Sequence, residues 1–123
     1  VDGGMSDNPR PITYQSPYTA VLADRPLPGA EEPQETVTLA GKHCESGDVL
    51  LRGLTLPNPA LGDVLVVFAT GAYNASMASN YNRIPRPAAV LVSGGTAELV
   101  QRREQPEELL RYDVLPARLA PIA

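Results

Sequence analysis

The 123-residue chain has one cysteine and no tryptophan, and only one histidine and one phenylalanine. A single cysteine cannot form an internal disulfide, so the sequence lacks the mark of a small secreted scaffold and favours the reducing cytoplasm. The formal net charge of -4 argues against a nucleic-acid-binding surface, which requires a basic face. No apolar run approaches the ~20 residues that span a bilayer, and no signal peptide is visible. Neither nucleic acid nor a membrane is therefore an expected partner.

Long helices are also excluded, because 13 prolines are spread through the chain and proline is poorly accommodated inside helices and central strands. This composition favours short strands joined by turns. We expect a mainly β fold, an antiparallel β-barrel or sandwich with one or two short helices, built as one domain at this length. The sequence begins with Val1 rather than methionine, and we expect it to start inside a larger protein.

Four short segments have the patterns of β-strands. Residues 36–40 alternate polar and apolar side chains, which is typical of a half-buried strand. Residues 19–23 and 49–51 are further candidates. Residues 64–69 are apolar on both faces, so they predict the most buried strand of the domain.

Later in the chain, Gly94 and Gly95 separate two apolar runs. This arrangement predicts a β-hairpin formed by residues 88–92 and 97–101.

Two segments are candidate helices. Residues 72–79 have small side chains and no β-branched residue, which predicts a short, closely packed helix. Residues 105–111 carry proline and acidic residues near their start, as a helix N-terminus prefers.

The remaining segments are expected to be irregular. Asn8-Pro9-Arg10-Pro11 is predicted to be extended or a turn, because a residue before proline is disfavoured in the helical region. Residues 26–34 form a proline- and acid-rich connection that we expect to be solvated. The domain is expected to span residues 1–113, followed by a proline- and alanine-rich tail over 114–123 without periodicity.

The segment with the most chemistry is Gly41-Lys42-His43-Cys44-Glu45-Ser46-Gly47-Asp48, which holds the only cysteine, histidine and lysine of the chain. Charged residues between glycines are unsuited to a core, and glycine lets the backbone bend and approach a ligand closely. The segment is therefore predicted to be a functional loop. A thiol near Lys42 and His43 is expected to titrate closer to neutrality, which suits both proton donation and nucleophilic attack.

Other interpretations of Cys44 exist. A lone cysteine is often a small buried hydrophobe, although its charged neighbours argue against this here. One cysteine and one histidine do not fill a four-ligand zinc site, so no metal is expected. A local Cys-His hydrolytic pair is also disfavoured, because adjacent side chains on an extended chain point to opposite sides.

Two further groups of residues are candidates for ligand binding. In an extended segment Arg10 and Tyr14 lie on the same face and could converge on one carboxylate, which arginine binds bidentately. The alternative is a surface arginine in a stiff turn. Tyr73 belongs to a hydroxyl- and amide-rich stretch at an expected helix start, which suits a phosphate; the alternative is a capped helix with packed tyrosines. That stretch also contains Ser76, Asn80, Tyr81 and Asn82.

Together these motifs resemble the C-terminal β domain of the diaminopimelate decarboxylase family, which belongs to the fold-type III pyridoxal-phosphate-dependent decarboxylases. The resemblance covers residues 1 to about 113. The matching stretches are residues 1–11 with Tyr14, 41–48, 69–82 with the turn at 83–87, and 102–110.

The resemblance implies a carboxy-lyase that converts meso-diaminopimelate to L-lysine with pyridoxal 5'-phosphate as cofactor. Cys44 would be the acid that protonates the carbanion left when carbon dioxide departs, and Glu45 would bind the ammonium group at the far end of the substrate. Arg10 and Tyr14 would hold the far carboxylate. Tyr73 would contact the cofactor phosphate and lie close to the substrate.

The family architecture further implies an N-terminal (β/α)8 barrel, which this chain lacks, and a homodimer in which the loop with Cys44 reaches the cofactor of the other subunit. The lysine that binds the cofactor is also absent, because Lys42 lies in the Cys44 loop, where the family's cofactor lysine does not lie. The isolated chain is therefore expected to be inactive. The alternative is a non-catalytic β module that dimerises or pairs with a separate barrel chain.

Overall fold

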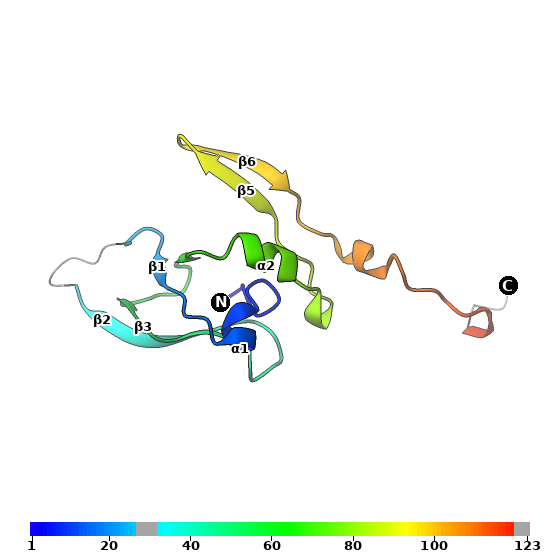
Figure 1. Ribbon diagram of the computed structural model, residues 1–123, viewed down its shortest axis with the longest axis horizontal. Coiled ribbons are helices and arrows are strands. Elements are labelled where there is room, and N and C mark those ends of the chain that lie inside the picture. The colour runs from blue at the N-terminus through cyan, green and yellow to red at the C-terminus, as the bar shows by residue number, and fades with distance from the viewer. Residues whose placement is uncertain (27–31, 120–123) are drawn as a thin grey trace. The chain divides into compact units, whose positions relative to one another are not determined.

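In the computed structural model, residues 1–26 and 32–119 are described (Figure 1). The chain divides into two compact units, Val1–Ser79 and Asn80–Ala123, and the expectation of one domain stays a prediction. The boundary at residue 113 stays a prediction. Among the described residues, no helix is long and apolar enough to cross a membrane.

The described part of the first unit, residues 1–26 and 32–79, contains four strands in two antiparallel pairs. β1 (Ala20–Leu22) pairs with β4 (Leu65–Val67), and β2 (Gln34–Ala40) pairs with β3 (Val49–Pro57). The predicted strands at 19–23 and 36–40 are confirmed, while β3 is much longer than expected. β2 and β3 are adjacent in sequence, so the loop between them is the segment with Cys44.

Leucine side chains form the core of the first unit. Leu22 is completely buried, and Leu39, Leu50 and Leu51 form one cluster with Ala20. Partly buried hydrophobic residues pack against this cluster; they are Tyr18, Leu54, Leu65 and Val67. The cluster joins both strand pairs, so it fixes the positions of the loops at the strand ends.

The prediction of a strand buried on both faces at residues 64–69 is wrong. β4 has only three residues and pairs with β1 alone. Leu65 and Val67 face the core, whereas Val66 is 38% exposed and Phe68 is 48% exposed. With one neighbouring strand, β4 buries the alternate residues on one face and leaves the others in contact with solvent.

Two short helices complete the first unit, α1 (Arg10–Tyr14) and α2 (Ala72–Met77). The helix at 72–79 was predicted, but the expectation that the segment around Arg10 is extended or a turn is wrong. Pro9 is the N-cap and Pro11 lies in the first turn, where proline loses no helical hydrogen bond. The preference of a residue before proline for extended backbone is overcome here.

Over residues 80–119, the second unit contains one hairpin and three 3-10 turns. β5 (Ala89–Ser93) pairs with β6 (Thr96–Gln101). Gly94 and Gly95 have φ of 55° and 78°, so the tight turn predicted from these glycines is confirmed.

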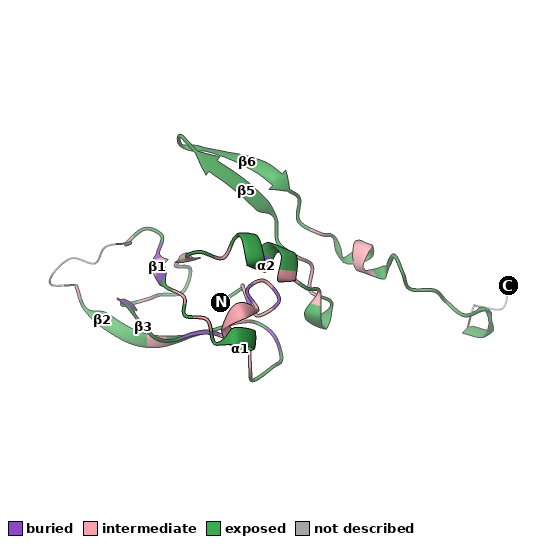
Figure 2. Cartoon of the chain, in the orientation of Figure 1, coloured by how far each residue is buried: buried purple, intermediate pink, exposed green. Residues whose placement is uncertain are grey.

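The 3-10 turns of the second unit are Tyr81–Arg83, Pro106–Leu110 and Ala117–Leu119. The second lies in the predicted helix at 105–111, and a capping box joins Gln105 and Glu108 at its start. The third lies in the tail for which no structure was predicted. None of the described residues from 80 to 119 is buried (Figure 2).

The fold is therefore mainly β with two short α-helices, as expected. Within residues 1–26 and 32–119 the strands form three separate two-stranded antiparallel sheets, and no closed barrel is found. Part of the predicted connection at 26–34 and the end of the tail lie outside the described residues.

Candidate functional site

The loop at residues 41–48 is closed by hydrogen bonds within its own backbone. The Gly41 amide donates to the carbonyl oxygen of Asp48 at 2.8 Å, and the Asp48 amide donates to the carbonyl oxygen of Glu45 at 3.1 Å. These bonds turn the chain through a short excursion between β2 and β3. Cys44 lies in this loop, which connects the paired strands β2 and β3.

Buried polar residues attach the loop to the N-terminal segment. Asp48 is 3% exposed; its Oδ2 atom accepts a hydrogen bond from the His43 amide at 2.8 Å, and its Oδ1 atom accepts one from the Met5 amide at 2.7 Å. His43 is also buried, with Nε2 2.9 Å from Oγ of Ser6. The Asp48 carboxylate and the His43 imidazole thus attach the loop to Met5 and Ser6 of the N-terminal segment.

Cys44 and its neighbours Lys42 and Glu45 are exposed. The interpretation of Cys44 as a buried hydrophobe is therefore wrong. The imidazole of His43 lies in the buried layer while the thiol faces solvent, as expected for adjacent side chains. Glu45 accepts a hydrogen bond from the Gly47 amide at 3.0 Å.

Arg10 is held among aromatic side chains. Its guanidinium carbon lies 5.1 Å from the centre of the Tyr73 ring, a distance at which a cation is attracted to the ring face. Its Nη1 atom lies 3.5 Å from the hydroxyl oxygen of Tyr18, and Nδ2 of Asn74 donates to the same hydroxyl at 3.1 Å. Arg10 and Tyr73, predicted from separate motifs, are therefore neighbours.

Tyr14 and Tyr73 are 60% and 68% exposed, so neither is a packed core tyrosine. A helix, like a strand, places residues four apart on one face, so the prediction that Arg10 and Tyr14 share a face does not depend on which form the segment adopts. The α1 helix reaches the Cys44 loop through Ile12, whose Cδ1 atom would lie 2.6 Å from a Cβ atom at Gly47.

Two side chains of the polar stretch after Tyr73 form hydrogen bonds within the protein, and the predicted role of the stretch in binding a phosphate stays a prediction. Oγ of Ser76 donates to the Tyr73 carbonyl oxygen at 2.9 Å. Nδ2 of Asn80 donates to the Ile84 carbonyl oxygen and to Glu104. The side chains of Ser76 and Asn80 therefore bond to the protein itself, while Tyr73 is exposed.

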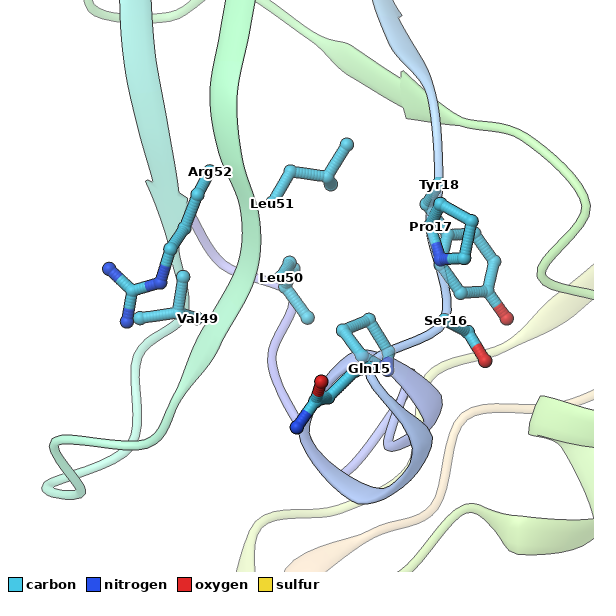
Figure 3. Close-up of a pocket in the computed structure, with 9 residues that line it drawn as sticks. Gln15, Ser16, Pro17, Tyr18, Val49, Leu50, Leu51 and Arg52 are labelled. Carbon is cyan, nitrogen blue, oxygen red and sulfur yellow. The ribbon is translucent and has the colours of Figure 1, made fainter.

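Two of the cavities in the described part of the first unit are not lined by the predicted site residues. One of about 460 Å³ lies between the segment after α1 and the first half of β3, with Arg52, Leu50, Leu51 and Tyr18 around it (Figure 3). The other, about 420 Å³, lies beside Val1, Leu39 and Leu65. These two cavities therefore do not contain the predicted site residues.

The sequence interpretation missed three residues that contact the site, namely the buried Asp48 and Asn74 and the partly buried Tyr18. Asp48 and Asn74 lie inside the recognised motifs, but no sequence spacing shows that Asp48 contacts Met5 or that Asn74 contacts Tyr18. Among the described residues no group of three histidine, cysteine or acidic side chains could hold a metal ion.

The sequence is similar to known proteins over almost its whole length. Residues 1–71 match the family described as "Pyridoxal-dependent decarboxylase, C-terminal sheet domain". A protein named diaminopimelate decarboxylase from Synechocystis sp. is 63% identical over 119 residues, covering 97% of this chain and 25% of that protein. A Bacillus subtilis protein of the same name is 53% identical over 114 residues, covering 93% of this chain and 25% of that protein.

The structure is similar to that of a solved diaminopimelate decarboxylase from M. jannaschii, which was crystallised with L-lysine. The TM-score is 0.85 at 37% sequence identity, covering 97% of this chain and 26% of the solved chain. The chain thus spans about a quarter of the length of the relatives that it matches.

Proposed function

Because the chain belongs to the pyridoxal-dependent decarboxylases, as their C-terminal sheet domain, we propose that the full protein converts meso-diaminopimelate to L-lysine and carbon dioxide. The observation that carries this proposal is the high identity to the Synechocystis diaminopimelate decarboxylase along 97% of the chain. The reaction belongs to lysine biosynthesis, and we propose the cytoplasm as its location.

The residues present fit a contact with pyridoxal 5'-phosphate but not its covalent attachment. The exposed phenol of Tyr73 can donate a hydrogen bond to a phosphate, and Arg10 lies beside its ring. The only lysine is Lys42, in the exposed Cys44 loop. The cofactor supplies the electron sink for loss of carbon dioxide. Its lysine anchor must come from sequence outside this chain, so the isolated chain is inactive.

Cys44 acts as the proton donor. When the carbon–carbon bond to the departing carboxylate breaks, the reacting carbon must gain a proton to form L-lysine. The Cys44 thiol can deliver that proton because Asp48 attaches its loop to the N-terminal segment. It can regain a proton from water because it is exposed to solvent. A positioned acid of this kind contributes about 10²–10⁴-fold to a rate.

Glu45, Arg10 and Tyr14 recognise the end of the substrate that does not react. Diaminopimelate carries both an ammonium and a carboxylate at that end. Glu45 provides a carboxylate for the ammonium, while Arg10 and Tyr14 provide a guanidinium and a phenol for the carboxylate. Hydrogen bonds to charged groups contribute about 1.5–3 kcal/mol each, so this combination discriminates against substrates that lack the far carboxylate.

We further propose that two copies of the full protein share each active site. Arg10 makes its contacts with Tyr73 and Tyr18, and no hydrogen bond among the described residues joins it to Cys44. A second subunit that contributes its Cys44 loop would complete the set of residues around one substrate.

The alternative, a non-catalytic module that pairs with a separate barrel chain, is favoured by the hairpin. Val90, Val92 and Leu99 are 54%, 68% and 64% exposed, and isolated two-stranded hairpins are marginally stable. The reading frame upstream of Val1 separates the two proposals: a barrel encoded in frame supports the enzyme, and a stop codon there supports the module.

The decarboxylase proposal is tested by assaying release of carbon dioxide from meso-diaminopimelate by the full protein with pyridoxal 5'-phosphate. Arg10→Ala should raise KM for diaminopimelate by about 10-fold to 10²-fold, because the far carboxylate loses its cation. The KM for D-lysine, which lacks that carboxylate, should change little. Arg52→Ala is the matched control, since Arg52 is exposed and lies in β3.

Wild-type protein without diaminopimelate decarboxylase activity would refute the proposed function. Equal losses with diaminopimelate and D-lysine would refute the proposed role of Arg10 alone.

A further inference from the structure

We propose that Asp48 is a positioning residue that fastens the Cys44–Glu45 loop to the segment leading into Arg10. The inference rests on the proposed function, because it concerns how the acid and the substrate-binding residues are placed. Asp48 lies at the end of the loop, is 3% exposed and directs its carboxylate into the protein. It does not face the surface on which Cys44 lies.

Each oxygen of this carboxylate is bonded to a different part of the chain. Oδ2 accepts from the His43 amide at 2.8 Å, which is the residue before Cys44. Oδ1 accepts from the Met5 amide at 2.7 Å. No ion pair with Asp48 is found within the described residues. The negative charge is therefore matched by backbone N–H groups of the two segments that it joins.

Two neighbouring glycines leave room for this carboxylate, because a side chain at either position would collide with it. A Cβ atom at Gly41 would overlap the Asp48 side chain, and a Cβ atom at Gly4 would lie 3.1 Å from Oδ2 of Asp48 and 2.8 Å from Cδ2 of His43. Side chains at either position would push the loop and the N-terminal segment apart. By contrast, nothing lies within 4 Å of a Cβ atom at Gly3.

The N-terminal segment transmits this attachment to the substrate-binding residues. The Gly4 carbonyl oxygen accepts hydrogen bonds from the amides of Asp7 and Asn8 at 2.9 and 3.0 Å, which forms a turn directly before α1. Ile12 of α1 in turn lies against Gly47 of the loop. Asp48 thus lies at the junction of two segments, one carrying Cys44 and Glu45 and the other carrying Arg10 and Tyr14.

A neutral amide cannot replace the carboxylate in this position. Asparagine offers one acceptor oxygen, and its NH₂ group would face one of the two backbone N–H donors. Glutamate keeps the charge but adds a methylene where the bare backbone of Gly41 already touches the carboxylate. If charge near Cys44 were the role of Asp48, glutamate would restore activity; if placement is its role, glutamate would not.

The test uses the full protein with pyridoxal 5'-phosphate and the variants Asp48→Asn, Asp48→Glu and Gly41→Ala, with Gly3→Ala as the matched control. Displacing a catalytic group by about 1 Å can cost ~10²-fold in rate. We expect kcat for diaminopimelate to fall by 10-fold to 100-fold in the first three variants and to be unchanged in Gly3→Ala. The double variant Asp48→Asn with Gly41→Ala should resemble the single variants, because both break one attachment.

A local measurement keeps the inference testable if a variant is unstable or the protein has another activity. Backbone amide hydrogen exchange at Met5 and His43 should be slow in the wild type and at least 10-fold faster in Asp48→Asn. Wild-type kcat in both Asp48→Asn and Gly41→Ala, restoration of kcat by Asp48→Glu, or unchanged amide exchange would each overturn the positioning role. Loss of decarboxylation in the wild type itself would instead refute the proposed function, and the exchange rates would still decide the role of Asp48.

Discussion

The two units of the chain are stabilised in different ways. Every buried residue among those described lies in the first unit, around the leucine cluster and the polar layer under the Cys44 loop. The second unit has an exposed hairpin and pairs arginine with carboxylate, as in Arg86 with Glu104 and Arg102 with Glu108. All five predicted site residues belong to the first unit, so the side chains proposed for catalysis and binding lie in the unit that has a packed core.

Truncating one apolar side chain in each unit should show the largest difference in stability between the two units. Leu51 is 8% exposed in the core and Val92 is 68% exposed in the hairpin. Leu51→Ala should lower the free energy of unfolding by about 2–5 kcal/mol through lost burial and a cavity. Val92→Ala should change it by less than about 0.5 kcal/mol. Urea unfolding of both variants measures the difference, and equal losses would contradict the division.

Glu104 is the centre of the second unit. Its carboxylate accepts hydrogen bonds from Nδ2 of Asn80 at 2.6 Å, and from the backbone amide and Nε of Arg86 at 2.9 and 2.8 Å. Glu104→Gln should destabilise this unit by about 1–2 kcal/mol, at the lower end for charged hydrogen bonds because the pair is partly exposed. The control Glu98→Gln, at an exposed position of β6, should have almost no effect. Chemical shifts of the hairpin during urea titration report the loss, and equal behaviour of the two variants would argue against this role.

The stability of the second unit should also depend on acid pH. Hydrogen bonds from Arg86 lower the pKa of Glu104 to about 2, and those from Arg102 lower the pKa of Glu108 to about 2, both from 4.5. A carboxyl group whose pKa is lower in the folded state stabilises it above the unfolded pKa, and this contribution is lost as pH falls. We expect stability to decrease between about pH 5 and pH 2, as followed by hairpin resonances, and the decrease to be smaller in Glu104→Gln. A flat profile in the wild type would contradict the contribution of these pairs.

The smallest effect concerns backbone strain beside the site. Ala69, in the segment between β4 and α2, has φ of 58°, a conformation that costs an L-residue about 1–2 kcal/mol relative to glycine. Ala69→Gly should therefore stabilise the first unit by about 0.5–1 kcal/mol after the added entropy of the unfolded chain. Ala75→Gly in α2 is the control of opposite sign and should destabilise by about 0.5–1 kcal/mol. Thermal unfolding measures both, and destabilisation by Ala69→Gly would contradict the strain.

Local sequence signals predicted the elements that depend on local chemistry. Gly94 and Gly95 predicted the hairpin turn because glycine readily adopts positive φ, as both residues do in the structure, and the alternation at 36–40 predicted β2. The apolar run at 64–69 was misinterpreted, because burial of the second face requires a neighbouring layer that the described chain does not supply. The α1 helix was missed because the preference of residues before proline is a tendency, not a prohibition.

The chemistry of the site was predictable in part. The identity and exposure of Cys44 and Glu45 follow from a charged loop between glycines, and Arg10 and Tyr73 were selected from their motifs. The contact of Asp48 with Met5 joins segments that are far apart in the sequence. The contact of Tyr18 with Arg10 joins α1 to a residue outside that helix. No periodicity or spacing in one sequence encodes such contacts, so only the three-dimensional structure reveals them.

The most direct test of the account compares two residues of the same exposed loop, Cys44 and Ser46, in the full protein with pyridoxal 5'-phosphate and meso-diaminopimelate. Cys44→Ala should lower kcat by about 10²–10⁴-fold with little change in KM or in the free energy of unfolding, while Ser46→Ala should keep wild-type kcat. A Cys44→Ala enzyme with wild-type kcat would contradict the central claim that this chain supplies the proton donor of a decarboxylase.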